Sequence, residues 1–418
     1  MTITTDRPVG DLVDPNRARP RGFLAALEGR PALGHIGPNW YASVMGTGIV
    51  ANAAATLPVQ TPVLHGVAVS VWLLATGLLV LVTAATITHW RRHPATARSH
   101  LDHPVMSHFY GAPAMALLTV GAGAVLLGRP ILGAAAVPVD AVLWSAGTLL
   151  GLWTAVTVSV RAFTSHRNEP DAAFGGWLMP VVPPMVSAAT GALLIPHLPA
   201  GEAQTTMLFG CYALFGMSLF AGMIIITLLW NRLVQHKIGP APMVPTLWIA
   251  LGVLGQSVTA AHNLGQQAAN ILPAPYGPVF DAVGLAFGLP VWGFALLWLG
   301  IAATITWRVA RDTHTGLPFT LTWWSFTFPL GTVVTGTSGL AATTGLWLFA
   351  IVAVILYAGL VVAWVTVTVR TARGAWRGDL LLSPASAGQQ GQLLRNRAIA
   401  DRSQCPEPRS GPGPGPRW

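Results

Sequence analysis

The 418-residue sequence predicts an all-α integral membrane protein in which ten transmembrane helices form five similar hairpins. Hydrophobic residues make up 53% of the chain and charged residues only 9%, whereas soluble domains carry about 25% charged residues. The apolar residues are gathered in ten runs, each about as long as a membrane-spanning helix. Basic residues follow every second run. This composition excludes a soluble multidomain enzyme, and we expect no enzymatic activity and no catalytic residues.

Ten runs of roughly 20 apolar residues are the expected membrane spans. They cover residues 38–57, 64–88, 106–127, 139–162, 177–196, 205–230, 243–264, 278–305, 318–339 and 343–369. Short loops between several of them favour helical hairpins. The chain is thereby divided into an N-terminal tail (1–37), a transmembrane domain (38–370) and a C-terminal tail (371–418). The C-terminal tail is rich in Gly, Pro, Ser and Gln and is expected to be disordered.

Basic residues mark one side of the predicted membrane domain. Nine of them follow spans 2, 4, 6 and 8, whereas only Arg129 lies in the loops on the other side. The positive-inside rule therefore places both tails in the cytoplasm of a multi-pass plasma-membrane protein. Of the net charge of +9, an excess of +5 lies in residues 370–418, so no folded basic face is available and no nucleic-acid partner is expected. The N-terminus has no apolar region typical of a cleaved signal peptide.

An internal repeat follows the same alternation. Even-numbered spans end in basic signatures, namely HWRRH (89–93), VRAF (160–163), LWNRL (229–233), WRVAR (307–311) and VRTAR (369–373). Odd-numbered spans instead contain or begin with proline. Proline in a membrane helix is tolerated where neighbouring groups or water satisfy the freed carbonyls. We therefore expect the five hairpins to close into a ring, with the odd helices inside and the even helices forming an outer wall.

The predicted membrane interior contains almost no ionisable residues. Asp140 and Asp281 lie near the outer ends of spans 4 and 8, and no Lys or Arg lies in the middle of a span. This argues against an arginine-ladder voltage sensor and against a carboxylate proton relay. The only lysine is Lys237 and no phosphate-binding loop occurs, which excludes ATP-driven transport by this chain. A neutral path with small and hydroxyl side chains suits a solute that binds weakly and passes.

Histidine and cysteine suggest no cofactor or metal. Most of the twelve histidines lie at span ends or in loops, and no facing pair suited to a membrane haem is seen. The cluster His89, His93, His100 and His103 is read as a solvated basic loop, with a metal site as the alternative. Cys211 lies in an apolar span and Cys405 in the tail, so no disulfide is implied.

Four segments resemble one known family of membrane proteins. They are GPNWYASVMGTGIV (37–50), HPVMSHFYGAPAMALLTVGAG (103–123), GGWLMPVVPPMVSAATG (175–191) and TWWSFTFPLGT (322–332). They are similar to the tellurite-resistance/dicarboxylate transporter family, which includes fungal malate permease, fungal sulfite efflux pumps and plant slow anion channels. The resemblance covers roughly residues 37–371. It implies ten helices as five hairpins around a central pore, often in a homotrimer, and a small anion as substrate.

The resemblance also implies a gate and a set of pore-lining residues. In channel-like members a phenylalanine of the ninth helix closes the pore, and the matching position is Phe328, with Phe326 as the alternative. An apolar ring blocks an ion because the ion cannot shed its water there. The other pore-lining candidates are Met45, Gly46, Thr47, Gly48, Pro113, Pro183, Thr327 and Pro329.

The expected function is therefore a passive or weakly coupled anion transporter or channel in the lipid bilayer. Its substrates would be small organic acids such as malate and other C4-dicarboxylates, or oxyanions such as sulfite or tellurite. From the residues alone the sign of the permeating charge is open, because helix N-termini favour anions and freed carbonyls favour cations. A proton-coupled dicarboxylate carrier, in which His108 or His262 titrates, is the alternative. A membrane haem or redox protein is a remote third.

Overall fold

The computed structural model describes residues 22–27, 29, 31–166, 169–313 and 316–382. Within these ranges the regular structure is entirely helical, with α-helices and short 3-10 helices and no strand. This confirms the predicted all-α class. The chain forms two compact units, one of residues 36–372 and one that combines 1–35 with 373–418, and each is described by itself.

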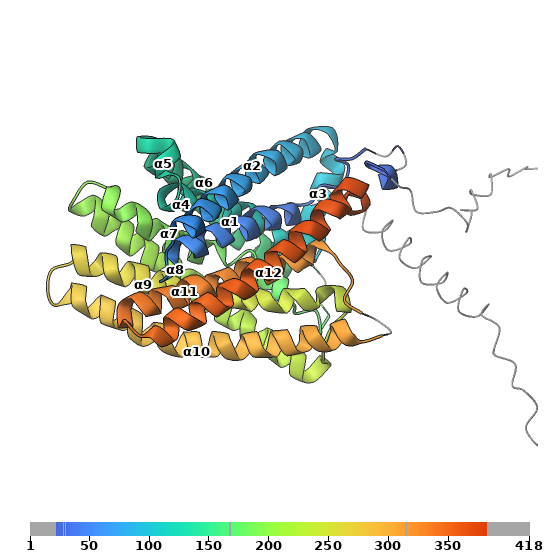
Figure 1. The fold of residues 1–418 in the computed structure, drawn as a ribbon. Helices are drawn as coiled ribbons and strands as arrows, with labels where there is room; N and C mark the ends of the chain where they lie inside the picture. The colour runs from blue at the N-terminus through green and yellow to red at the C-terminus, as the bar shows by residue number, and fades with distance from the viewer. Residues whose placement is uncertain (1–21, 28, 30, 167–168, 314–315, 383–418) are drawn as a thin grey trace, which may run out of the picture. The chain divides into compact units, whose positions relative to one another are not determined.

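The odd- and even-numbered spans correspond to two sets of helices in the larger unit (Figure 1). The odd set is α1 (Tyr41–Thr56), α4 (Gly111–Leu126), α7 (Pro183–Leu194), α9 (Ala250–Ile271) and α11 (Phe328–Thr344). The even set is longer and comprises α2 (Pro62–Arg92), α6 (Ala136–Thr164), α8 (Glu202–His236), α10 (Tyr276–Arg311) and α12 (Trp347–Arg377). Two short helices were not expected, α3 (Pro94–Asp102) and α5 (Arg129–Leu132).

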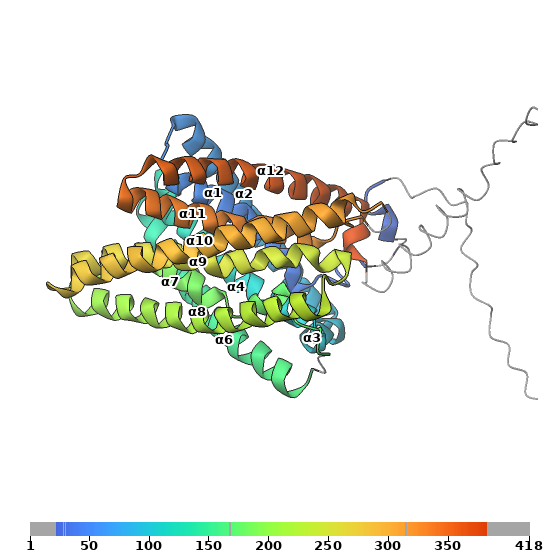
Figure 2. The same ribbon diagram turned by 90° about the horizontal axis from the view of Figure 1, so that it is seen from below.

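The odd set forms a closed ring. In the order α1, α4, α7, α9 and α11, each helix contacts the next, and α11 contacts α1. Helices α2, α6, α8 and α10 each pack outside the ring against the inner helix before them and the inner helix after them; Figure 2 shows α8 to α12 side by side. The last outer helix, α12, is attached to α1 by a hydrogen bond from Trp364 Nε1 to Thr47 Oγ1 (3.1 Å). This is the arrangement expected from the alternation of proline-rich and proline-poor spans.

Each inner helix is preceded by a 3-10 helix. These segments are η2 (Pro38–Trp40), η3 (Met106–Tyr110), η5 (Gly175–Leu178), η7 (Ala241–Ile249) and η8 (Leu321–Phe326). Proline stands at the start of η2, α7, η7 and α11, where its missing N–H breaks no helical hydrogen bond. The α-helical parts that remain are short: α1, α7 and α11 span about 24, 18 and 26 Å, less than the roughly 30 Å of a bilayer core.

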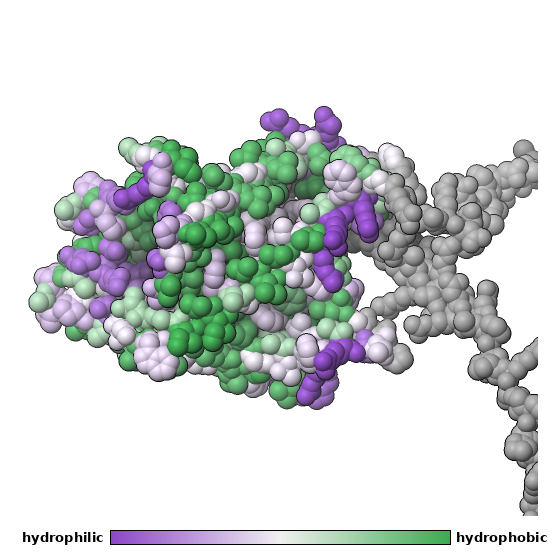
Figure 3. All heavy atoms as spheres, in the orientation of Figure 1, coloured by the Kyte–Doolittle hydropathy of each residue, from purple (hydrophilic) through white to green (hydrophobic). Residues whose placement is uncertain are grey.

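Seven helical stretches of the described residues are long and apolar enough to cross a membrane. Five belong to the outer wall, where 17–33% of the most apolar window is buried, and two are the stretches around α4 and α9, where 72% and 83% is buried. The outer helices therefore present apolar side chains outward, and green apolar surface dominates the middle of the face in Figure 3. The chain is a multi-pass membrane protein, and the apolar wall faces lipid.

The smaller unit joins the two ends of the described chain. Phe23 and Trp376 pack edge to face with ring centroids 4.9 Å apart, and the Leu24 N–H donates to the Trp376 carbonyl (2.8 Å). Helix α12 continues to Arg377, so the first residues of the predicted C-terminal tail are helical. The remaining tail residues, 383–418, lie outside the described residues, as do residues 1–21.

Candidate functional site

A small cavity lies where the N-terminal ends of the five inner helices meet. Its volume is about 10 Å³, the least space that holds one water molecule. Every inner helix, or the segment just before it, contributes residues to the lining of the cavity. They are Ala42, Met45, Phe109, Met115, Met179, Val182, Ile249, Gly252, Ser325, Phe328 and Pro329.

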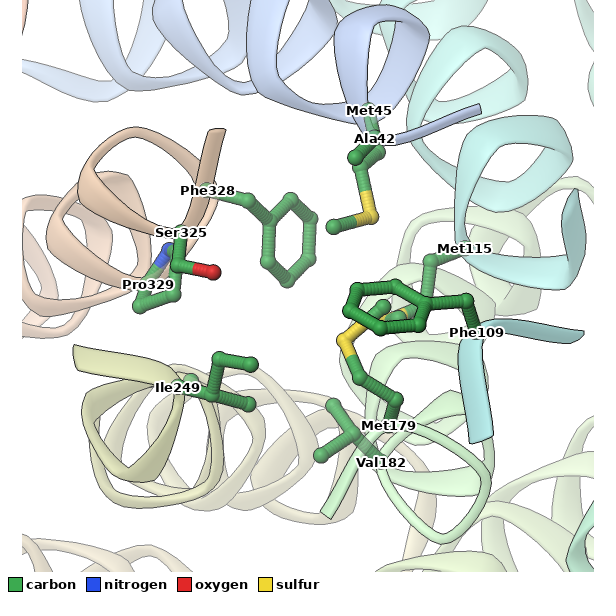
Figure 4. A pocket seen from close by; sticks show the side chains of 11 residues that line it. Ala42, Met45, Phe109, Met115, Met179, Val182, Ile249, Ser325, Phe328 and Pro329 are labelled. Carbon is green, nitrogen blue, oxygen red and sulfur yellow. The ribbon is translucent and has the colours of Figure 1, made fainter. Parts of the chain in front are cut away.

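The Phe328 ring fills the centre of this site. Phe328 is the first residue of α11, and its side chain is only 2% exposed. Figure 4 shows the ring pointing into the cavity, with Met45 on one side and Phe109, Met115 and Met179 across from it. Thioether and aromatic side chains pack favourably against an aromatic ring. The Phe328 ring and the apolar side chains around it, called the plug below, leave a cavity of only about 10 Å³ between the inner helices.

Phe326 lies away from the cavity. Its ring packs edge to face on Trp248 (centroids 5.1 Å apart) and on Trp323 (5.6 Å). The two phenylalanines diverge because the chain changes from the 3-10 helix η8 to the α-helix α11 at Thr327, whose φ and ψ are −97° and −74°. Of the two predicted gate positions, Phe328 is the one that the structure places in the cavity.

Among the other pore-lining candidates, only Met45 and Pro329 line the cavity. The MGTG motif that follows Met45 packs α1 against its neighbours. A Cβ on Gly46 would lie 2.6 Å from Cε3 of Trp324, and one on Gly48 would lie 2.8 Å from Cγ2 of Thr119. Thr47 accepts the hydrogen bond from Trp364 of α12. These small residues let the helices approach closely, as in other membrane helix interfaces.

The remaining three candidates also lie outside the set of lining residues. Pro183 faces α6, because a Cβ added to Gly151 of that helix would lie 2.7 Å from the Cβ of Pro183. The Thr327 hydroxyl donates to the Trp324 carbonyl (2.7 Å) and closes the turn before α11. Pro113 is the third residue of α4 and is half-buried. It lies near Met115 but does not line the cavity.

Sequence reasoning missed most of the cavity residues. Five of them precede an inner helix: Phe109, Met179, Ile249 and Ser325 lie in or next to its 3-10 segment, and Val182 comes directly before α7. Each therefore occupies a similar place in its repeat. The signal that could have found them is this position, just before the start of each proline-containing helix, rather than residue type.

The electrostatics of the site favour an anion. First-turn residues of α1, α9 and α11 line the cavity, and α4 and α7 begin close to it, since Met115 and Val182 line it. The first N–H groups of α1, α4 and α9 donate to carbonyls of the preceding 3-10 segments. What these helices offer at the cavity is therefore their dipole, which is equivalent to about half a positive charge at the N-terminus. Among the residues described, no charged side chain lines the cavity. The helix dipoles therefore favour an anion over a cation at the cavity.

The ionisable side chains named from the sequence lie elsewhere. Asp140 is fully buried in α6 beside Gly121, and neither carboxylate oxygen has a hydrogen-bond partner. His108 packs against the rings of Phe174 (5.7 Å) and Trp177 (6.2 Å). His262 Nδ1 is hydrogen-bonded to the Thr343 hydroxyl (2.8 Å). Across the described ranges, no three His, Cys, Asp or Glu side chains form a group that could hold a metal ion.

A membrane-embedded ring of helices around an apolar constriction is the architecture of a channel or transporter. The chain belongs to the voltage-dependent anion channel family (SLAC1), whose family model matches residues 35–372. This confirms the resemblance read from the four motifs, and the family consists of channels and transporters, not enzymes.

Individual relatives are transport proteins. The chain is 30% identical over 322 residues to a sulfite efflux pump of Trichophyton rubrum, covering 73% of this chain and 82% of that protein. It is 28% identical over 297 residues to an uncharacterized transporter of Methanocaldococcus jannaschii, covering 71% and 81%. It is 20% identical over 303 residues to the malic acid transport protein of Schizosaccharomyces pombe, covering 71% and 68%.

Proposed function

We propose that the chain conducts small oxyanions through the middle of the five-helix ring, passively or with weak coupling, and that Phe328 is the gate. The observation that carries this proposal is the position of the Phe328 ring in a cavity of about 10 Å³ at the N-termini of five helices. The N-termini attract an anion, and the apolar plug keeps it from passing until the ring moves. Since no side-chain charge holds the anion, it binds weakly and leaves readily.

The proposal extends to the topology. With their 3-10 segments, α1, α7 and α11 complete ten membrane crossings arranged as five hairpins around a central pore. The cytoplasmic side is then the side of the inner-helix N-termini, because the basic residues at the ends of α2, α6, α8 and α10 precede them. Both tails are cytoplasmic in this arrangement, and the membrane is the plasma membrane. A homotrimer, as the family resemblance implies, is part of the proposal.

Sulfite is the first substrate to test and malate the second. The relative named a sulfite efflux pump is 30% identical to the chain, and the relative named a malic acid transport protein is 20% identical. The narrow plug region also favours the smaller oxyanion. Nitrate and chloride serve as inert probes of conduction.

Purified protein in liposomes is expected to conduct sulfite under an imposed membrane potential, with malate slower. A stopped-flow or electrode assay of sulfite, malate, nitrate and chloride, against empty liposomes and liposomes with an unrelated helical membrane protein, measures this. No flux of any of the four anions would contradict the proposed function. Flux of potassium in place of anions would contradict the sign assigned from the helix N-termini.

A proton-coupled carrier is the second candidate, because Asp140 is a buried carboxyl group without a hydrogen-bond partner. Asp140 faces Gly121 of α4, not the cavity. We therefore expect Asp140→Asn to keep the wild-type flux within about twofold, since a substitution away from the pathway leaves its barrier unchanged. Flux should also persist when an uncoupler collapses the proton gradient. Loss of uptake with the uncoupler and in Asp140→Asn together would establish the carrier instead.

A further inference from the structure

One buried polar group near the plug has an unsatisfied hydrogen-bonding atom. Gln256 of α9 is 4% exposed, and its carboxamide oxygen is buried and accepts no hydrogen bond. Most buried polar atoms in folded proteins are paired. Its polar neighbours along α9 are paired: the Thr259 hydroxyl with that of Thr335 (2.7 Å), and Asn263 Nδ2 with the Ala189 carbonyl (3.1 Å).

Helical geometry places Gln256 on the inner face of the ring. Gly252 lines the cavity, and residues four, seven and eleven positions later share its face of the helix. On one flank, Gly255 contacts α11, with Val333 N only 2.5 Å from an added Cβ. On the other flank, Asn263 bonds to α7. At about 100° per residue, Gln256 lies about 20° from Asn263 and about 100° from Gly255, so it is on the α7 side of this face, about 6 Å beyond Gly252 on the side of the plug away from the helix N-termini.

A carboxamide offers a specific set of hydrogen bonds. Its nitrogen donates and its oxygen accepts, and it carries no charge. A ligand that satisfies both ends must therefore have an acceptor oxygen and a proton of its own. Halide, nitrate and fully ionised sulfite have no proton to donate, and fully ionised malate has only its alcohol O–H. The singly protonated oxyanions, hydrogen sulfite in its O–H form and hydrogen malate, have both.

We propose that Gln256 forms a substrate subsite for singly protonated oxyanions just beyond the Phe328 plug. Its Nε2 donates to an anionic oxygen, and its Oε1 accepts the hydrogen bond of the acid O–H. The subsite rests on the proposed conduction path and adds the substrate's protonation state to it. A monoanion also loses less hydration free energy than a dianion on entering the membrane, so both effects select the same species.

The test compares hydrogen sulfite with nitrate in one set of liposomes. Gln256→Met keeps the length of the side chain and removes both hydrogen-bonding ends. We expect hydrogen sulfite flux to fall by about tenfold, the effect of one or two lost hydrogen bonds to an anion, and nitrate flux to stay unchanged. Gln266→Met is the matched control, because Gln266 is exposed near the end of the same helix, and it should change neither flux.

The remaining outcomes separate the subsite from the conduction path. Equal loss of both fluxes in Gln256→Met, or loss of neither, would overturn the subsite. Absence of all flux in the wild type would overturn the proposed function instead. A wild-type rate of hydrogen sulfite flux through Gln256→Met would mean that the carboxamide bonds only to water.

A measurement on the wild-type protein keeps the subsite testable if Gln256→Met does not fold. As pH rises through the second ionisation of sulfurous acid, sulfite flux should fall with the monoanion fraction, while nitrate flux stays level. Nitrate also controls for the titratable groups on and around α9, namely His262, Cys211, Tyr212 and Asp281, because their titration would alter both fluxes. Sulfite flux that holds steady as the monoanion disappears would overturn the subsite.

Discussion

Phe328→Ala is expected to raise anion flux in proteoliposomes by about tenfold, which corresponds to a barrier lower by about 1.4 kcal/mol. The wild-type cavity has a volume of only about 10 Å³ because the aromatic ring fills it. Without the ring, water can occupy the space between Met45 and Phe109, and an anion can keep part of its hydration shell. Nitrate efflux measured at a fixed membrane potential gives the rate directly.

The matched control is Phe326→Ala. Phe326 is buried like Phe328 but packs on Trp248 and Trp323, outside the cavity. Both variants lose a large apolar contact and should melt at lower temperature, since truncating a buried phenylalanine costs about 3–5 kcal/mol. Only Phe328→Ala should conduct faster. A rise in flux of the same size in both variants would mean that loosened packing opens the path and that Phe328 is not the gate.

The fold followed from features of the sequence that act locally. An apolar run must become a helix in a bilayer because its backbone polar groups have no other partners. The alternation of proline-rich and proline-poor spans distinguished inner from outer helices. Proline is tolerated at the start of a helix that is surrounded by other helices, because they can satisfy the backbone groups that proline leaves free. The sequence did not show the 3-10 segments, because the local change from 3-10 to α geometry at residues such as Thr327 depends on packing against neighbouring helices.

The site was harder to predict than the fold. Of the candidates, Met45, Phe328 and Pro329 line the cavity. Phe328 was named through the family resemblance, because nothing local distinguishes it from thirteen other phenylalanines. Gly46, Thr47 and Gly48 were chosen because they are small or polar, and such residues suit a pore. They suit close helix packing equally well, and this is where the structure places them. Residue type alone could not separate these two roles, whereas three-dimensional neighbours do.

Close backbone approach beside the plug leads to the second large effect, the loss of folded protein in Gly111→Ala. Gly111 begins α4, directly after the segment that carries Phe109. A Cβ there would overlap the Met179 carbonyl oxygen, and it would lie 2.6 Å from the carbonyl carbon and 3.1 Å from Cα of Pro180. These are backbone atoms, so no side-chain rotation relieves the overlap. The helix has to move away from the segment that contributes Met179 to the cavity.

We expect Gly111→Ala to lose at least about 3 kcal/mol of stability, the upper end of ordinary overpacking, and to lose regulated conduction. Gly77→Ala is the control: Gly77 lies inside α2 with no atom within 4 Å of an added Cβ, so alanine should stabilise that helix slightly. Thermal unfolding in detergent, followed by nitrate flux on the folded fraction, distinguishes the two. A Gly111→Ala protein with the wild-type melting temperature would show that α4 and the segment before α7 do not meet through their backbones. Phe328 and its neighbours can block the path only while the helices that carry them keep fixed positions relative to one another. Without that backbone contact, the plug would lack the rigid surroundings that a gate needs.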